Sequence, residues 1–156
     1  YAGSFLDEYF QKAGGQAAVL VEAQEEGVIP ASYPVVGFDD LIQRDGNPKD
    51  RQNVTLSWRK SEWGASLSAF RIGSIYQSSL TLADGTRYVL PSMTTYNATV
   101  DYRFDLAGTD TRLRFGVNNL SDERAPLADD YFGYLSDAHS DWGRSYYLDL
   151  RVSFGK

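Results

Sequence analysis

The only histidine of the chain, His139, lies in an acidic segment, and imidazole and carboxylate groups together can bind cations or small polar ligands. Asp137 and Asp141 flank it, and Asp129 and Asp130 come shortly before it. One histidine among scattered carboxylates lacks the ligand spacing of a metal site, and the acidic run does not match an EF-hand loop. Two interpretations remain: a ligand or cation site, or a solvated loop with its own hydrogen bonds, which is the commoner case for a polar loop. A ligand site would use Asp129, Asp130, Tyr131, His139, Asp141 and Trp142.

Catalytic chemistry has little support in the sequence. No serine lies in a nucleophile-elbow motif, and spacing ties the single histidine to no serine. The chain has no cysteine, which excludes disulfides and thiolate metal ligands. Its net charge of −6 argues against a general nucleic-acid-binding protein. We therefore expect no enzyme activity, no metal, no cofactor and no nucleic-acid partner.

The segments that would position these residues change character near residue 53, where hydrophobic and polar residues begin to alternate. Near the end of the chain, for example, Leu148, Leu150 and Val152 alternate with Asp149 and Arg151. Such alternation places successive side chains on opposite faces of a β-strand. The pattern predicts five strands, over residues 53–59, 63–69, 96–105, 112–118 and 145–154.

One side of these expected strands is apolar, and on the last three strands the other side carries charges of both signs. Burying so many charges in a soluble core would cost several kcal/mol each unless every one were paired, whereas a water-filled lumen removes that cost. Arg71 falls on the apolar side if the alternation continues past Ala69, so we expect it at the outer rim or beyond a β-bulge. The residues expected to face the lumen are Asp101, Arg103, Arg112, Arg114, Asp149 and Arg151. Those expected to face lipid are Tyr96, Val100, Tyr102, Phe104, Leu148, Leu150, Val152 and Phe154.

The links between the strands alternate in length. Residues 60–62 and 106–111 form short links, and residues 72–93 and 120–144 form long ones. Outer-membrane barrels have short periplasmic turns, long external loops and two girdles of aromatic residues. Ten residues rise about 33 Å, and a tilt near 45° leaves about 24 Å of height, close to the apolar band of such barrels. Aromatic residues also gather at two heights: Trp58, Trp63, Phe104 and Phe154 near the short links, and Tyr96 and Tyr146 at the other end.

Residues 1–52 read as a separate region, a long external loop that contains helical segments. Phe5, Leu6, Tyr9 and Phe10 recur at helical spacing, which predicts a helix that begins after Ser4 and ends at residues 14–15. A second helical run covers residues 16–26. The expected organisation is therefore a loop with a helix over 1–52, followed by barrel strands and loops over 53–156.

Three segments of the second region resemble the C-terminal end of TonB-dependent outer-membrane receptors. They are LPSMTTYNATVDYRF (90–104), LRFGVNNLSDE (113–123), and WGRSYYLDLRVSF (142–154), which is similar to the family's Gly-Arg-x-Tyr-Tyr ending with an aromatic terminus. The resemblance implies an all-β fold: an antiparallel meander of about five long strands from the end of a 22-stranded barrel that encloses an N-terminal plug. It also implies import of a scarce nutrient, such as an iron chelate, cobalamin or an oligosaccharide, across a bacterial outer membrane. The implied partners are outer-membrane lipid, the TonB complex, the nutrient, and the assembly machinery that reads the final strand.

The chain departs from the family in two ways. Gly155 and Lys156 follow Phe154, where the family usually ends on the aromatic residue. The plug, the TonB-contacting segment and about three quarters of the strands are missing, so we expect a piece of a longer protein. The alternative is a soluble β-rich module that binds a ligand or carbohydrate, with Asp101 and Arg103 facing bulk water.

Overall fold

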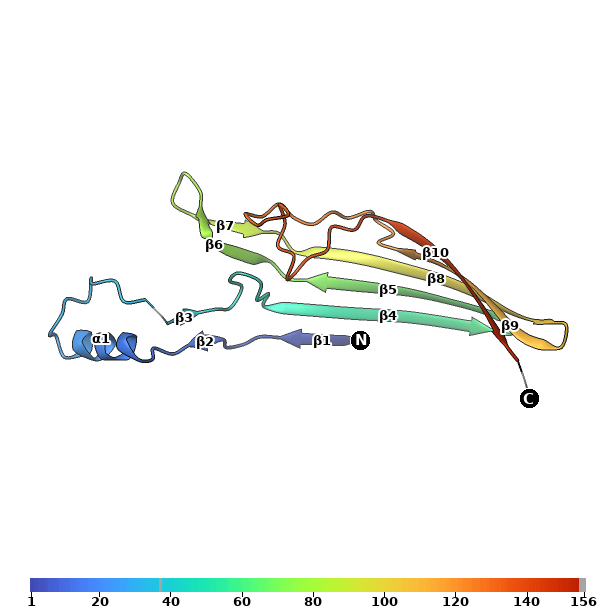
Figure 1. Cartoon of the computed structure of the whole chain (residues 1–156), viewed down its shortest axis with the longest axis horizontal. Coiled ribbons are helices and arrows are strands. Elements are labelled where there is room, and N and C mark those ends of the chain that lie inside the picture. Colours follow the sequence, from blue (N-terminus) through green and yellow to red (C-terminus); the bar gives the residue numbers. More distant parts are fainter. Residues whose placement is uncertain (37, 155–156) are drawn as a thin grey trace.

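The computed structural model describes residues 1–36 and 38–154 and is mostly β, with 48% of residues in strands and 7% in helix. Its main sheet has six strands in the order β1-β4-β5-β8-β9-β10, with every neighbouring pair antiparallel (Figure 1). The long strands are β4 (Asp50–Lys60), β5 (Trp63–Ile72), β8 (Met93–Leu106), β9 (Thr109–Asn118) and β10 (Ser145–Ser153). The short elements are β1 (Ala2–Phe5), β2 (Phe10–Gln11), α1 (Gln16–Glu25), β3 (Asp39–Asp40), β6 (Ile75–Thr81) and β7 (Arg87–Leu90).

The five long strands confirm the predicted antiparallel meander. Each predicted strand is present, and most extend further than the alternation indicated: β8 covers 14 residues. The predicted short links are two-residue turns, Ser61–Glu62 and Ala107–Gly108. Positive φ angles at Ala107 (54°) and Gly108 (78°) match the turn type whose twist suits a hairpin.

The expected helix from Phe5 onward is wrong. Residues 2–5 form β1 instead, which pairs with the start of β4 from Ala2↔Asn53 to Phe5↔Asp50. Phe10 begins β2, which pairs with β3. Backbone pairing along the exposed edge of β4 outweighs a short amphipathic stripe, because an isolated helix of that length has little stability of its own. The sheet therefore includes residues on both sides of position 52.

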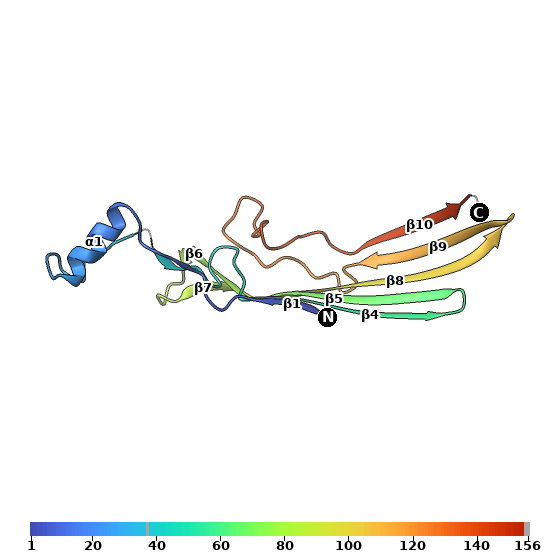
Figure 2. The same ribbon diagram turned by 90° about the horizontal axis from the view of Figure 1, so that it is seen from below.

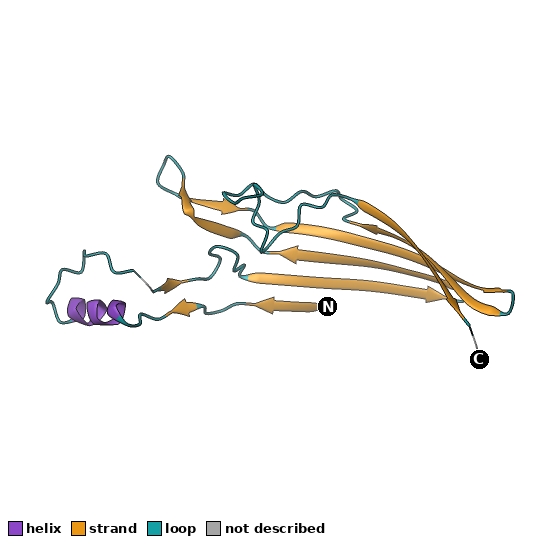
Figure 3. Cartoon of the chain, in the orientation of Figure 1, coloured by secondary structure: helices purple, strands orange, loops and turns teal. Residues whose placement is uncertain are grey.

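The second expected helix is confirmed as α1, which ends one residue before its expected end. It projects away from the sheet at the end opposite the two-residue turns (Figure 3). No residue of α1 is buried. The Gln24 side chain donates hydrogen bonds to the carbonyl groups of Pro30, Ala31 and Tyr33, and so ties the following loop to the helix.

The long link between β5 and β8 contains a hairpin that we did not predict, formed by β6 and β7. Asp84 accepts hydrogen bonds from the Thr86 amide (2.9 Å) and hydroxyl (2.6 Å), and Gly85 has a φ of 83°. Asp-Gly between two strands is a strong signal for a hairpin turn, so this hairpin was predictable from the sequence.

The sheet forms a single curved layer, with the large loops at one end and the tight turns at the other (Figure 2). The small buried core lies at the loop end, where Ile72 and Ile75 pack against Ala138 and the half-buried Leu135. No helix among residues 1–36 and 38–154 is long and apolar enough to cross a membrane. The expectation about Gly155 and Lys156 concerns residues outside the described part of the chain.

Candidate functional site

The strand register sorts the side chains of the sheet into an apolar face and a polar face. Trp58, Ala65, Val100, Phe115 and Leu148 are cross-strand partners and therefore form one row across all five long strands. Because residues two apart share a face, the neighbouring rows belong to the same side. The row nearer the loops is Leu56, Leu67, Ala98, Val117 and Tyr146, and the row nearer the turns is Lys60, Trp63, Tyr102, Leu113 and Leu150. We call this side of the sheet the apolar face.

The register places the residues expected to face lipid on the apolar face, except Phe154, which follows the last strand. Aromatic rings pair near the turns, where Trp63 and Tyr102 lie 4.7 Å apart between ring centroids. Nearer the loops, Phe115 stacks on Tyr146 at 6.2 Å. The expected lipid-facing residues in strands are Tyr96, Val100, Tyr102, Phe104, Leu148, Leu150 and Val152.

Arg71 has the parity of the apolar face, as expected, and lies at the loop end of β5. The pairing of β5 with both neighbours runs through Arg71 without a register shift, so no bulge moves it. Its Nη1 lies 2.5 Å from Oδ2 of Asp50, which also accepts a hydrogen bond from Gln52. An acidic partner at the rim therefore neutralises the one arginine of β5.

The opposite side of the sheet, the polar face, holds the six residues expected to face the lumen. Asp101, Arg114 and Asp149 are cross-strand partners, so their row alternates in charge. The next row, Arg103, Arg112 and Arg151, consists of arginines alone. Asp105 and Asp110 follow in the row after that. Carboxylates therefore border the arginine row on both sides, and the polar face balances most of its own charge.

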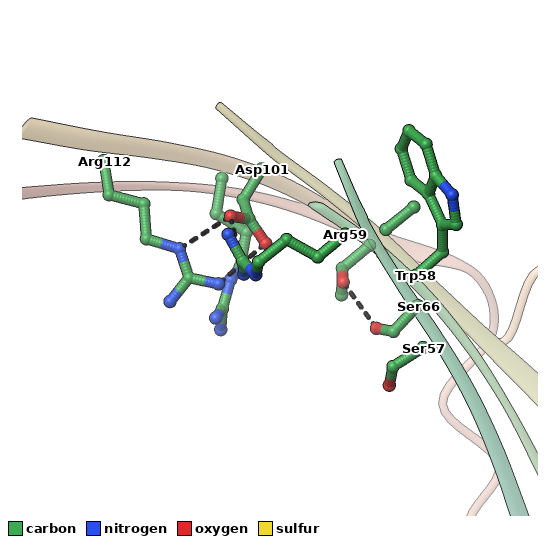
Figure 4. A pocket seen from close by; sticks show the side chains of 9 residues that line it. Ser57, Trp58, Arg59, Ser66, Asp101 and Arg112 are labelled. Atoms are coloured by element: carbon green, nitrogen blue, oxygen red, sulfur yellow. Dashed lines mark hydrogen bonds and ion pairs between the residues drawn. The ribbon is translucent and has the colours of Figure 1, made fainter. Parts of the chain in front are cut away.

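Asp101 is the most buried charged residue of the polar face, with 5% of its surface exposed. Arg112 donates two hydrogen bonds to it, from Nε to Oδ2 (3.0 Å) and from Nη2 to Oδ1 (2.7 Å). Arg59 reaches the same carboxylate at 3.4 Å across Gly64 (Figure 4). A Cβ on Gly64 would lie 2.8 Å from Oδ1 of Asp101, so the missing side chain makes room for this ion cluster. Arg114 lines the same pocket, of 280 Å³, and its Nε is buried without a hydrogen-bond partner in the described part of the chain.

A second close approach on the polar face joins β9 to β10. The Tyr147 ring lies over Gly116, its cross-strand partner, and a Cβ at Gly116 would be 2.2 Å from the ring atom Cζ. An aromatic ring that covers a strand glycine supplies the packing that glycine lacks. The sequence showed both residues on the polar side but gave no sign of the contact.

The six residues expected to form a ligand site in loop 119–144 differ in their surroundings. Among residues 1–36 and 38–154, no three His, Asp or Glu side chains lie close enough to hold a metal ion. Tyr131 and Trp142 are exposed, at 91% and 82%. Asp130 accepts a hydrogen bond from the Tyr131 amide. Asp129 bonds to the β6–β7 hairpin, where its main chain makes two hydrogen bonds with the Gln77 side chain.

Asp141 serves as a structural partner in this loop. Arg124 donates two hydrogen bonds to it, at 2.9 and 2.5 Å, and the Ala125 amide donates a third at 2.9 Å. These contacts, with the Arg124 guanidinium first, lower the pKa of the Asp141 carboxyl to about 2. Its oxygens are therefore already used within the loop.

His139 is buried, with 4% of its surface exposed. It lines a pocket of 240 Å³ whose floor is the loop end of the polar face, including Phe70, Met93 and Thr95. Both of its ring nitrogens are buried and have no hydrogen-bond partner within the described structure. Burial lowers the pKa of the imidazole, and the charge of Arg51 lowers it further.

Asn119, which we did not predict as a site residue, organises the loop. Its side chain accepts a hydrogen bond from the Glu123 amide and donates to the carbonyl groups of Glu123 and Trp142. Its φ of 52° lies in the left-handed region that asparagine tolerates. The Asn-Asn sequence at the end of a strand was the available signal, because asparagine side chains bond to the backbone of turns.

Comparison of the chain with protein-family models, with curated proteins and with solved structures found no match.

Proposed function

We propose that this chain forms part of the wall of a bacterial outer-membrane β-barrel, in a TonB-dependent receptor that binds and imports a scarce nutrient. The observation that carries the proposal is the apolar face, a run of hydrophobic rows over five strands. No described element packs on it, and Leu56, Leu148 and Leu150 are 71%, 70% and 60% exposed. An exposed apolar patch of more than a few hundred Å² is rare on a soluble monomer, and the hydrocarbon of a membrane would cover it.

The polar face supports a water-filled lumen on the other side. Asp101 is paired with two arginines, and the charges along its own row, Asp101, Arg114 and Asp149, alternate. Mutual pairing lets such a face meet water or a polar plug with little desolvation cost. Strands of 9–14 residues also suit the thickness of an outer membrane.

The arrangement of links supports an orientation. The two-residue turns and the large loops lie at opposite ends of the sheet. In such barrels the turns are periplasmic and the loops external, so loop 119–144 and the β6–β7 hairpin would meet the nutrient. The receptor activity, the classes of nutrient and the TonB and assembly partners rest on the sequence resemblance.

Site-directed spin labelling along β8 tests the proposal, and the absence of native cysteine makes each label unique. Labels at residues 97–102 of the protein in phospholipid vesicles should alternate: Ala98, Val100 and Tyr102 should collide mainly with dissolved oxygen, which concentrates in hydrocarbon. Labels at Asn97, Thr99 and Asp101 should collide mainly with a water-soluble nickel complex. A nickel preference at the even-numbered positions would contradict the proposal.

The alternative, a soluble β-rich module that binds a ligand or carbohydrate, requires a second layer over the apolar face. It predicts a monodisperse protein without detergent, and labels at Ala98 and Val100 that neither oxygen nor nickel reaches well.

A further inference from the structure

A short turn of loop 119–144 folds back onto the loop end of the polar face. The amides of Ala138 and His139 both donate to the Leu135 carbonyl, at 3.1 and 2.8 Å, which closes one helical turn. Ala138 packs against Ile72 and Ile75, with Leu135 beside them. We call residues 135–139 the docking turn. Few residues hold it in place, so its attachment depends strongly on each one.

His139 is the polar side chain placed inside this attachment. It lies beside Phe70, Ile72, Met93 and Thr95, which are all uncharged. Both ring nitrogens are shielded from solvent and neither has a hydrogen-bond partner in the described residues. A neutral imidazole tolerates this position at a modest cost. An imidazolium there would be a buried charge with no carboxylate paired to it among the described residues, which is far more costly.

Among the described groups near the ring, only the Leu135 carbonyl in the docking turn favours a proton on it, and burial and the charge of Arg51 outweigh that contact. From β4, Arg51 faces the ring and repels a proton on it. Asp137, in the docking turn, lines the same pocket but makes no ion pair with the ring. The side chains from β5 (Phe70, Ile72), β8 (Met93, Thr95) and β6 (Ile75) are all uncharged. Asp50, next to Arg51, has the parity of the other face and pairs with Arg71.

We propose that protonation of His139 releases the docking turn, so that it covers the loop end of the polar face at neutral pH and leaves it in mildly acidic solution. The release would uncover Phe70, Met93 and Thr95 and the 240 Å³ pocket that they line. This inference concerns the loop alone and does not depend on which medium covers the apolar face.

The direction of the pH dependence follows from linkage. The docked state lowers the pKa of His139, so it binds fewer protons than the released state, in which the ring is solvated. Docking is therefore strongest above the ordinary histidine pKa of about 6.5 and weakens as the pH falls below that value. His139 is the only histidine of the chain, and histidine is the side chain whose ordinary pKa places its charge change between about pH 5 and 8.

The distance between two spin labels tests the release. One label replaces Ser136 in the docking turn (Ser136→Cys) and one replaces Asn53 on the polar face of β4 (Asn53→Cys); both positions are exposed. We expect one short, narrow distance at about pH 7.5 and a growing population of longer, broader distances at about pH 5. The docked-to-released ratio should fall between those conditions, by no more than about thirtyfold.

The matched control is His139→Phe in the same doubly labelled protein. Phenylalanine fills a similar volume and cannot be protonated, so the short distance should persist at both pH values. An unchanged distance distribution in the parent protein, or a release that also occurs in His139→Phe, would overturn the proposal.

The imidazole signals of the single histidine give an independent check that needs no variant. In NMR spectra of the unlabelled protein, His139 should titrate with a midpoint below about 6.5. A midpoint at or above that value would also overturn the proposal.

Discussion

Gly116 and Tyr147 show how one missing side chain shapes the polar face. A Cβ at Gly116 would overlap the Tyr147 ring, so we expect Gly116→Ala to displace the ring and lower the free energy of unfolding by about 1–3 kcal/mol. Gly14→Ala is the matched control, because nothing lies within 4 Å of a Cβ there, and it should change stability by less than about 0.5 kcal/mol. Urea unfolding of both variants measures the difference.

Truncation of the ring isolates the cause. In a Tyr147→Ala background the overlap is gone, so Gly116→Ala should cost markedly less than in the parent protein. Equal costs in both backgrounds would mean that the glycine is needed for another reason, since coupling between the two positions is what the contact predicts.

The pair Arg124–Asp141 predicts a pH effect at the residue scale. The folded loop lowers the pKa of Asp141 to about 2, so its contribution is fully present above the ordinary aspartate pKa of about 3.9 and is lost as the pH falls through about 2. Carbon-13 titration of the Asp141 carboxyl should show this low midpoint, and Arg124→Gln should move it toward about 3.9. Arg144→Gln is the control, since among residues 1–36 and 38–154 the Arg144 guanidinium makes no ion pair with Asp141, and its amide bonds to Asp122. A parent midpoint near 3.9 would contradict the assignment.

Burial of His139 could not be predicted from its sequence neighbours. The flanking residues Asp137 and Asp141 suggested a solvated or ligand-binding loop. The side chains that bury the ring, Phe70, Ile72 and Met93, are more than 40 positions away in sequence. Local composition reports the polarity of a segment, whereas burial depends on which distant elements it meets.

At the scale of elements, the long strands were predictable because period-two alternation reflects a physical requirement, two faces that meet different surroundings. The position of the turn at Ala107–Gly108 was predictable, because the alternation of apolar and polar residues breaks there. The β1 strand was not predictable, because the spacing of Phe5 and Tyr9 fits a helix as well as an extended chain. Pairing with β4 favours the extended chain. The β6–β7 hairpin was missed although Asp84 and Gly85 mark its turn.

Adjacent positions of β8 should respond very differently to substitution. Val100 lies in a central row of the apolar face, and Thr99 on the polar face bonds to Ser66 at 2.7 Å. If lipid covers the apolar face near its midplane, Val100→Arg should lower the free energy of unfolding in bilayers by about 2–4 kcal/mol. Thr99→Asn should cost less than about 1 kcal/mol, because it keeps a hydrogen-bonding side chain on a wet face. Denaturant titration in vesicles compares the two, and equal costs would speak against a lipid-facing side.

At the scale of the whole molecule, the sheet is open at both edges. Within residues 1–36 and 38–154, β10 pairs only with β9, and β1 covers β4 only as far as Asn53, so the backbone of β4 beyond that residue is an exposed edge. Long exposed edges and a continuous apolar face both favour association in water. The small core around Ile75 at the loop end covers neither the open edges of the sheet nor its apolar face.

The chain in water without detergent should therefore sediment as large assemblies, and it should be dispersed by detergent micelles that cover the apolar face. A triple variant with Leu56→Lys, Leu148→Lys and Leu150→Lys places charges in three of its most exposed apolar positions and should bind less detergent and sediment more slowly in buffer alone. The matched control, Thr55→Lys, Ser57→Lys and Ser153→Lys, adds the same number of positive charges to exposed positions of the polar face and should still require detergent. Because the two variants differ in the face that carries the lysines, analytical ultracentrifugation separates the effect of the apolar face from a general effect of charge.

A parent chain that is monodisperse in plain buffer would instead favour the soluble module, since some layer would then have to cover the rows that contain Leu56 and Leu148.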